Sequence, residues 1–258
     1  MERRLVEGDC IEGMKRLESD SFNLIIADPP YNLNKDFGAW KEKEKKDTWR
    51  AWTWEWLTQA ERLLSPKGNI FVYGIHRHQC WVQCMLFDLG LEYRRQIIWH
   101  YENGFAGYSA RTLNACYEPI LWFSKTNDYI FHTIREPYKS QARLKHRVTK
   151  NGKVWTPHPD GRRAGDVWSF PTLAGRRFRD EKVDHPTQKP LSISTRIVRH
   201  FSNEGDNILV PFVGSGSECV AAEQEGRGYV GFELNPDYLA IARDRLAAVN
   251  AETQRSLI

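Results

Sequence analysis

The sequence lacks the features of a secreted or membrane-bound protein. None of its apolar runs approaches the length of a membrane-spanning helix. The N-terminus leads directly into a strand-like segment, without the apolar region of a signal peptide. The five cysteines are scattered and odd in number, which favours reduced thiols over a disulfide framework. We therefore expect a cytoplasmic protein that makes no contact with a membrane.

The spacing typical of metal ligands is also lacking. Cys80 and Cys84 lie in a predicted helix over residues 77–89. His76 and His78 precede this helix, but no second pair of ligands follows at the distance typical of a zinc site. Cysteines are also common in buried cores. We therefore expect no metal site.

Positive charge is present but unevenly distributed. Residues 132–182 contain 13 Lys and Arg against five Asp and Glu, a net charge of +8, so the remainder of the +4 chain carries −4. A basic segment beside a mildly acidic body is typical of a protein that contacts nucleic acid, although a solvated basic surface has the same composition. The segment has little periodicity but contains interleaved aromatic side chains. We expect a loop-rich, ordered insert over residues 132–184.

Elsewhere, short apolar runs alternate with amphipathic stretches, which predicts an α/β fold around one large core. Strands are expected over residues 5–10, 22–27, 69–74, 94–101, 117–123, 129–132, 207–210 and 229–233. Helices are expected over residues 11–17, 47–64, 77–89, 191–201, 218–225 and 236–249. The strands 117–123 and 129–132 are expected to pair as an antiparallel hairpin, because a turn-like Lys-Thr-Asn-Asp joins them.

The expected helix over residues 47–64 has two further features. Asp47 is placed to cap its N-terminus. Trp49, Trp52 and Trp56 recur at helical spacing, which favours core packing over a stacking platform for bases. The polar residues 32–46 before the helix are expected to form a solvated loop and a candidate lid.

The most informative stretch is Asp28-Pro29-Pro30-Tyr31, which follows an apolar run, Phe22–Ala27. Such a run fits a buried parallel strand, and the prolines end it because they cannot donate to a sheet ladder. A carboxylate and an aromatic ring therefore lie together on a stiff turn at the carboxyl end of a strand. Ligands bind at such ends in open α/β sheets. We expect a planar, amine-bearing base to be held here.

A second ligand site is predicted at Gly214-Ser215-Gly216, which joins an expected strand to an expected helix. Glycines there let a ligand approach the backbone, and the helix N-terminus offers free N–H groups. A dinucleotide fingerprint needs a third glycine where Cys219 stands, which disfavours a pyrophosphate ligand. Glu233 ends the next strand, and a carboxylate there can accept both hydroxyls of a ribose. If the strands before the two motifs are neighbours, both motifs contribute to one site.

The order of these motifs resembles that of the β class of amino-type DNA methyltransferases, which use S-adenosylmethionine. The resemblance covers almost the whole chain. It rests on Gly8-Asp9-Cys10, Asp28-Pro29-Pro30-Tyr31, Leu64-Ser65-Pro66-Lys67-Gly68, His185-Pro186-Thr187-Gln188-Lys189-Pro190, Pro211-Phe212-Val213-Gly214-Ser215-Gly216 and Glu233-Leu234-Asn235-Pro236-Asp237-Tyr238. It implies a Rossmann-like methyltransferase sheet with a circularly permuted motif order. Residues 1–131 would form the catalytic part of the methyltransferase domain, residues 132–184 the target-recognition insert, and residues 185–258 the S-adenosylmethionine-binding part.

The resemblance also assigns roles to residues. The catalytic residues would be Asp28, Pro29, Pro30 and Tyr31. The residues expected around S-adenosylmethionine are Asp9 and Cys10 near the adenine, Glu233 on the ribose, Phe212, Gly214, Ser215, Gly216 and Ser217 along the methionine portion, Thr187 and Lys189 near its carboxylate, and also Asp28 and Asn235. Candidate DNA contacts in the insert are Arg143, Lys145, Arg147, Arg162, Arg163, Arg176, Arg177 and Arg179. The implied partners are duplex DNA and a possible cognate restriction endonuclease on a separate chain. The protein would be a bacterial or phage-encoded monomer or homodimer.

The sequence departs from the family pattern at Val210, where members usually carry aspartate, and mildly at Ser217, where threonine is usual. Val210 would remove a polar group beside the cofactor. We predict cofactor binding weaker than is typical by about 1–2 kcal/mol, the size of one hydrogen bond to a charged group. An unchanged cofactor affinity in Val210→Asp would refute this prediction.

Two acceptors aimed at the hydrogens of an exocyclic base amine favour its tetrahedral form, because they oppose delocalisation of the nitrogen lone pair into the ring. The Asp28 carboxylate and the Pro29 carbonyl are placed to accept, and Tyr31 to stack on a base flipped out of the duplex. Adenine N6 and cytosine N4 both present such an amine. Tetrapeptides that begin with aspartate resemble the adenine enzymes more often, so adenine N6 is expected, with cytosine N4 as the alternative.

Three other functions are disfavoured by particular residues. A protein glutamine methyltransferase is expected to carry asparagine in place of Asp28. A catalytically silent DNA-binding module is disfavoured by the intact Asp28 and Tyr31. A nicotinamide oxidoreductase is disfavoured by Cys219 and by the basic insert.

Overall fold

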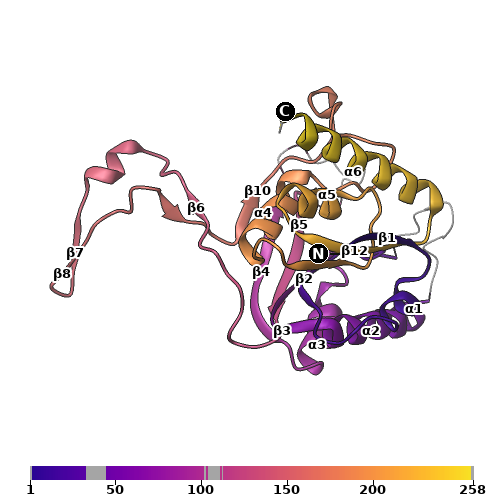
Figure 1. Ribbon diagram of the computed structural model, residues 1–258. Helices are drawn as coiled ribbons and strands as arrows, with labels where there is room; N and C mark the ends of the chain where they lie inside the picture. The colour runs from indigo at the N-terminus through magenta and orange to yellow at the C-terminus, as the bar shows by residue number, and fades with distance from the viewer. Residues whose placement is uncertain (1, 33–44, 102, 104–110, 112, 257–258) are drawn as a thin grey trace.

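The computed structural model describes residues 2–32, 45–101, 103, 111 and 113–256. Its centre is an eight-stranded sheet with the order β1-β12-β11-β2-β3-β5-β4-β10 (Figure 1). These strands are β1 (Arg3–Glu7), β2 (Phe22–Ala27), β3 (Leu64–Tyr73), β4 (Glu92–His100), β5 (Tyr117–Ser124), β10 (Val167–Ser169), β11 (Asn207–Val210) and β12 (Gly228–Glu233). β5 runs antiparallel to its neighbours β3 and β4, and the other neighbouring strands of this sheet are parallel.

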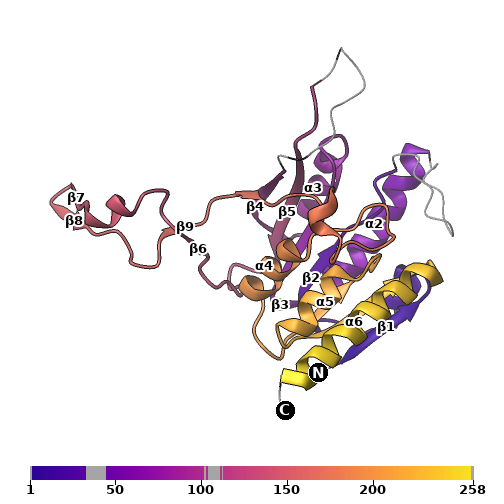
Figure 2. The same ribbon diagram turned by 90° about the horizontal axis from the view of Figure 1, so that it is seen from above.

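Helices cover both faces of the sheet (Figures 1 and 2). One layer consists of α1 (Cys10–Met14), α2 (Lys46–Leu63) and α3 (Gln79–Asp88), and the other of α4 (Leu191–Phe201), α5 (Ser217–Gln224) and α6 (Pro236–Ser256). In β2, Ile25 enters the core cluster on the first side and Leu24 and Ile26 enter the cluster on the second. This two-sided burial explains the continuous apolar run. The α/β prediction is confirmed, and no helix among the described residues is long and apolar enough to cross a membrane.

Two local predictions are wrong. Residues 129–132 do not pair with β5, because β3 and β4 occupy both edges of that strand. Instead the Ile130 N–H donates to the Lys67 carbonyl (3.1 Å). Asp47 does not cap α2, which begins one residue earlier with Lys45 at the capping position. The candidate lid falls mostly on residues 33–44, outside the described part of the chain.

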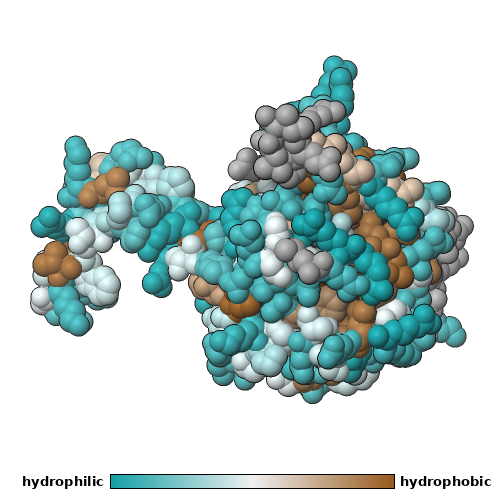
Figure 3. Space-filling model, in the orientation of Figure 1, coloured by the Kyte–Doolittle hydropathy of each residue, from teal (hydrophilic) through white to brown (hydrophobic). Residues whose placement is uncertain are grey.

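Part of the expected insert projects from the body as an arm, defined here as residues 135–163 (Figures 1 and 2). Its base is a short ladder of β6 (Arg135–Glu136) with β9 (Arg162–Arg163), and its outer end a hairpin of β7 (Val148–Lys150) with β8 (Lys153–Trp155). The arm also holds the 3-10 helix η1 (Gln141–Lys145), while η2 (Arg176–Phe178) follows β10. The arm is largely hydrophilic (Figure 3), although Val154 and Trp155 expose more than 60% of their surface.

Candidate active site

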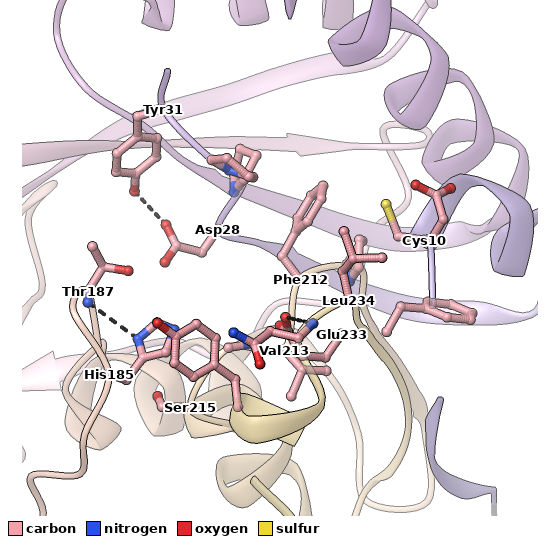
Figure 4. A pocket seen from close by; sticks show the side chains of 18 of the residues that line it. Cys10, Asp28, Tyr31, His185, Thr187, Phe212, Val213, Ser215, Glu233 and Leu234 are labelled. Carbon is pink, nitrogen blue, oxygen red and sulfur yellow. Dashed lines mark hydrogen bonds between the residues drawn. The ribbon is translucent and has the colours of Figure 1, made fainter. Parts of the chain in front are cut away.

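A cavity of about 400 Å³ lies at the carboxyl ends of the parallel strands, within the usual range for small-molecule sites (Figure 4). β2 and β11 are adjacent and parallel. The tetrapeptide that follows β2 and the glycine loop that follows β11 therefore line the same cavity, together with residues that follow β1 and β12. The lining includes the expected residues Asp9, Cys10, Asp28, Pro29, Pro30, Tyr31, Thr187, Lys189, Phe212, Gly214, Ser215, Glu233 and Asn235.

Both oxygens of the Asp28 carboxylate have hydrogen-bonding partners. The Tyr31 hydroxyl donates to Oδ1 at 2.5 Å, the contact drawn in Figure 4. The Lys189 ammonium lies 2.8 Å from Oδ2. Burial, and next the negative charge of Asp28, raise the pKa of Tyr31, so its hydroxyl stays protonated and acts as the donor. A substrate amine that uses Oδ1 must therefore take its remaining lone pair or replace the Tyr31 hydroxyl.

The Lys189 ammonium is buried among charged and aromatic groups. Its side chain is 5% exposed, and Nζ also lies 3.5 Å from Glu118 Oε2. Burial alone would lower the pKa of Lys189, but the carboxylates of Asp28 and Glu118 outweigh it, so the pKa is raised and the ammonium stays charged. Lys189 therefore lies beside the Asp28–Tyr31 tetrapeptide. Its expected contact with the cofactor carboxylate stays a prediction.

Glu233, at the end of β12, fixes the backbone around the glycine loop. Its Oε2 accepts from the Gly214 N–H (2.7 Å) and its Oε1 from the Asn235 N–H (2.8 Å). Each carboxylate oxygen has a further lone pair, so both can still accept from a diol. Asn235 in turn caps α6, because its side-chain oxygen accepts from the Asp237 N–H (2.8 Å).

The glycine loop approaches its surroundings too closely for a side chain at two positions. Gly214 has φ +50°, and a Cβ there would lie 2.9 Å from His185 Nε2. Gly216 has φ +81°, and a Cβ there would lie 2.8 Å from the Ala242 Cβ. These contacts leave the Gly214 backbone as part of the cavity wall.

The glycine loop also contains residues that lie behind the wall. Neither Gly216 nor Ser217 lines the cavity. The Ser217 hydroxyl donates to the Lys189 carbonyl (2.8 Å), and Arg245 donates to that hydroxyl (3.1 Å) and to the Ser215 carbonyl (2.6 Å). Gly216 and Ser217 therefore shape the wall indirectly, and their direct contact with a cofactor stays a prediction.

The opposite wall begins where β1 ends. Asp9 caps α1, since its Oδ1 accepts from the Ile11 N–H (2.9 Å) and the Glu12 N–H (3.0 Å). Burial, and next the Asp9 carboxylate, raise the pKa of Cys10, so the thiol stays neutral. The two residues give this wall an acidic group and a neutral thiol, and their contact with the cofactor adenine stays a prediction.

The tryptophans of α2 pack as predicted and also reach the cavity. Trp49 is 3% exposed and Trp56 is fully buried, so core packing is confirmed for both. Trp49 and Trp52 nevertheless line the cavity. The Trp49 indole N–H donates to the Pro30 carbonyl (3.0 Å), which ties the catalytic turn to α2. Trp52 lies against Phe212, with ring centroids 5.6 Å apart.

Sequence reasoning missed His185, Tyr238, Glu118 and Glu218. The His185 ring meets Tyr238 edge to face at 4.5 Å and accepts the Thr187 N–H at 3.3 Å (Figure 4). His185 and Tyr238 belong to the motifs His185–Pro190 and Glu233–Tyr238, on which the family resemblance rests. Membership of these motifs could have indicated that both residues lie at the site. Glu118 had no such signal, because its strand was paired incorrectly.

Val210 does not lie on the cavity wall. Its side chain is fully buried in the core cluster that also holds Leu24 and Ile26. An aspartate at this position would reach a cofactor only by leaving that packing, so Val210→Asp measures burial of a carboxylate as well as cofactor affinity. The predicted effect of Val210 remains untested.

Glu218, in the first turn of α5, is a buried carboxyl on the cavity wall. Its exposure is 4%, and Oε1 accepts from the Ser194 hydroxyl at 3.0 Å. Burial, and next the charge of Asp28, raise the pKa of Glu218 to about 6. The folded protein therefore holds this proton more tightly than the unfolded chain does, and folding stability falls as pH rises from about 4.5 to about 6.

We predict that Glu218→Gln is stabilising relative to the wild type above pH 6. Glutamine cannot ionise, so its relative stability should increase between pH 4.5 and pH 7 by up to about 2 kcal/mol, the value of a shift of about 1.5 units. Urea unfolding at both pH values measures this. Glu225→Gln is a control of opposite sign, because the Arg199 hydrogen bond lowers the pKa of Glu225, and its effect lies mostly below pH 4.5, where a third urea unfolding curve measures it. A stability difference independent of pH would contradict the prediction.

The eight candidate DNA contacts are all exposed but fall into three groups. Arg143, Lys145 and Arg147 lie on the outer half of the arm, and Arg162 and Arg163 at its base. Arg162 is paired with Glu136 at 2.6 Å. The remaining three, Arg176, Arg177 and Arg179, lie in or beside η2, outside the arm.

Comparison with known proteins gives a consistent result. The sequence profile of a family described as DNA methylase (N6_N4_Mtase) matches residues 22–244. The type II methyltransferase M1.MboII of Moraxella bovis is 30% identical over 243 residues, which cover 90% of this chain and 91% of that protein. The DNA adenine methyltransferase YhdJ of Escherichia coli K12 is 31% identical over 252 residues, or 95% of this chain and 82% of YhdJ. The crystal structure of an M1.HpyAVI–SAM complex superimposes with a TM-score of 0.66 at 23% identity and covers 95% of this chain and 99% of that one.

Proposed function

The chain belongs to the N6_N4_Mtase family of DNA methylases, and on that premise we propose that it methylates the N6 amino group of adenine at specific sites in duplex DNA. S-adenosylmethionine is the methyl donor in this proposal. The observation that carries it is that Asp28, Tyr31 and Glu233 line one cavity. The hydrogen-bond acceptor for the target amine, Asp28, and the acceptor for the ribose hydroxyls, Glu233, thereby lie in the same cavity.

The cavity has the chemistry that S-adenosylmethionine requires. Glu233 offers two carboxylate oxygens to the ribose hydroxyls. Asp9 and Cys10 line the part of the cavity proposed for adenine, and Phe212 lies between that part and Asp28 in Figure 4. When bound, the cofactor supplies a sulfonium methyl group.

The tetrapeptide positions the target amine. The Asp28 carboxylate and the Pro29 carbonyl accept its two N–H groups, and Tyr31 stacks on the flipped base. The amine need lose its proton only as the new bond forms, so Asp28 acts as a hydrogen-bond acceptor rather than as a strong base. Positioning of this kind supplies much of the rate of a group transfer.

Adenine is favoured over cytosine by the aspartate that begins the tetrapeptide, and the relative named as an adenine methyltransferase supports it. The test is to methylate DNA from a methylation-deficient host, digest it to nucleosides and identify the product by mass. N6-methyladenine is expected. N4-methylcytosine would transfer the proposal to the alternative target, and the absence of both would leave a silent DNA-binding module.

The arm and η2 are proposed to contact the DNA backbone. Between Lys139 and Lys153 the chain carries six Lys and Arg residues and no Asp or Glu. We further propose a cytoplasmic monomer or homodimer, with a cognate restriction endonuclease as a possible separate partner.

We predict that DNA binding is strongly dependent on salt, because each cation at a phosphate releases a counterion. Replacing Arg143, Lys145 and Arg147 together by alanine should weaken binding and reduce the slope of log K against log salt by up to about 2.7, or 0.9 per phosphate. Fluorescence anisotropy at several salt concentrations measures the slope. The control is Lys67→Ala, an exposed lysine outside the insert. Equal slopes for wild type and triple variant would contradict a role for the arm.

A further inference from the structure

We propose that Glu118 is a positioning residue for methyl transfer, which holds Lys189 on one oxygen of Asp28 and leaves the other oxygen for the target amine. The inference rests on the function proposed above. Glu118 belongs to none of the motifs by which the site was found.

Strand direction brings Glu118 to the active edge of the sheet. Tyr73, the last residue of β3, pairs with Ile120 of the antiparallel β5. Glu118 lies two residues earlier in β5, just past the end of β3. The start of β5 and the carboxyl ends of β2 and β3 therefore share one edge, where Asp28 also lies.

Lys189 connects the two carboxylates. Its Nζ lies 2.8 Å from Asp28 Oδ2 and 3.5 Å from Glu118 Oε2. Its side chain is 5% exposed, whereas those of Asp28 and Glu118 are 17% and 24% exposed. An ammonium so buried is held in place by its charged partners, since water contributes little.

The backbone of Lys189 is anchored at its carbonyl. Its carbonyl accepts from the Ser217 hydroxyl (2.8 Å), which Arg245 also contacts (3.1 Å). Without the charge of Glu118, the ammonium would be attracted mainly by Asp28, because Glu218 acts on it more weakly. It would then bridge both oxygens of Asp28.

The oxygen that must stay accessible is Oδ1. In the free protein it accepts from the Tyr31 hydroxyl at 2.5 Å. A target amine is also an N–H donor and can take the place of that hydroxyl, provided that Lys189 does not. The Tyr31 hydroxyl, 3.3 Å from Lys189 Nζ, separates the ammonium from this position.

The test compares Glu118→Gln with a matched control, Glu61→Gln. Glu61 also pairs with a lysine, Lys125, and its side chain is 27% exposed against 24% for Glu118. For each variant we would measure the single-turnover rate of methyl transfer to unmethylated DNA, the Kd of S-adenosylmethionine, the Kd of DNA and the thermal unfolding midpoint. A crystal structure of Glu118→Gln gives the position of Lys189 independently of activity.

We expect Glu118→Gln to reduce the transfer rate about tenfold or more, because small misplacements of reacting groups are costly. Both Kd values and the unfolding midpoint should match those of the control. Lys189 Nζ should lie within hydrogen-bonding distance of Asp28 Oδ1 in the crystal. Combining Glu118→Gln with Lys189→Gln should be no worse than Lys189→Gln alone, because both changes act on the same contact.

The proposal is overturned by a wild-type rate in Glu118→Gln, by additive losses in the double variant, or by an unmoved Lys189. If Glu118→Gln unfolds, Glu118→Asp replaces it. Aspartate keeps the charge, so transfer should recover at least in part, and a folded Glu118→Asp without activity counts against the proposal. If the wild type itself transfers no methyl group, the proposed function fails, while the crystal comparison still decides whether Glu118 holds Lys189.

Discussion

Replacing Asp28 by alanine is expected to leave cofactor binding intact and to abolish methyl transfer. Asp28 meets the Tyr31 hydroxyl and the Lys189 ammonium at one end of the cavity, whereas Glu233 lies beside the glycine loop (Figure 4). Removing an acceptor aimed at the reacting group should reduce the rate by about 1,000-fold or more, the upper range for one preorganised polar group. The Kd of S-adenosylmethionine should change less than about threefold, equivalent to about 0.6 kcal/mol.

Single-turnover methylation and calorimetric titration with S-adenosylmethionine measure the two quantities separately. Asp128→Ala is the control, because Asp128 is an exposed aspartate that pairs with Lys67 outside the cavity. Asp28→Asn keeps the shape but gives one donor to a site that needs acceptors, so it should be nearly as inactive. If Asp28→Ala instead fails to bind the cofactor, Asp28 belongs to the cofactor site and loses its proposed role at the target amine.

Replacing Glu233 by alanine is expected to weaken cofactor binding and to leave the rate of methyl transfer at saturating cofactor unchanged, which is the opposite of the result expected for Asp28→Ala. The change removes the acceptor proposed for the ribose and frees the Gly214 and Asn235 N–H groups that the carboxylate holds. Hydrogen bonds to a charged group contribute about 1.5–3 kcal/mol each, so the Kd should rise at least about 10-fold for one lost bond and about 100-fold or more for two. At saturating cofactor the transfer rate should recover, because Asp28 and Tyr31 are unchanged.

Calorimetric titration and the cofactor dependence of the transfer rate check this pattern. Glu225→Gln is the control, since Glu225 follows α5 and pairs with Arg199 outside the cavity. A cofactor affinity unchanged in Glu233→Ala would remove Glu233 from the ribose site. A rate that stays low at saturating cofactor would show that the glycine loop also orders the catalytic end.

The sequence was sufficient for the parts of the site that lie at the ends of parallel strands. β2 and β11 were expected at their observed residues, and their pairing joins Asp28 to the glycine loop. This succeeded because a continuous apolar run followed by proline or glycine marks both the strand and its end. Glu233 was likewise expected at the end of its strand and is the last residue of β12.

The antiparallel part of the sheet was not predictable in the same way. Pairing of 117–123 with 129–132 was inferred from a local turn, but β5 instead pairs with β3 and β4. Local turn signals carry no information about long-range partners. Because β5 is antiparallel, its first residues lie at the edge of the sheet where the parallel strands end. Glu118, near the start of β5, therefore lies at this edge, and the incorrect pairing hid it.

Side-chain roles were the least predictable. Lys189 and Ser217 were assigned to cofactor contacts by resemblance, which stays a prediction, but nothing in the sequence indicated that Lys189 lies against Asp28 or that Ser217 holds the Lys189 carbonyl. Trp49 was assigned to the core, where it is, but its indole also holds the catalytic turn. Helical spacing identifies which residues share a face, and it does not show that such a face borders a cavity.

The pairing of β1 with β12 has a consequence for how the protein is made. Arg3 pairs with Tyr229, 226 residues later, and β12 is the only neighbour of β1 in the eight-stranded sheet. At about 5–20 residues per second of translation, β1 waits roughly 10–45 seconds for its partner to be synthesised. The wall formed by Asp9 and Cys10 follows β1 directly. The part of the cavity that is translated first is therefore completed only after β12 has been synthesised, and a nascent chain that lacks β12 has an incomplete cavity wall.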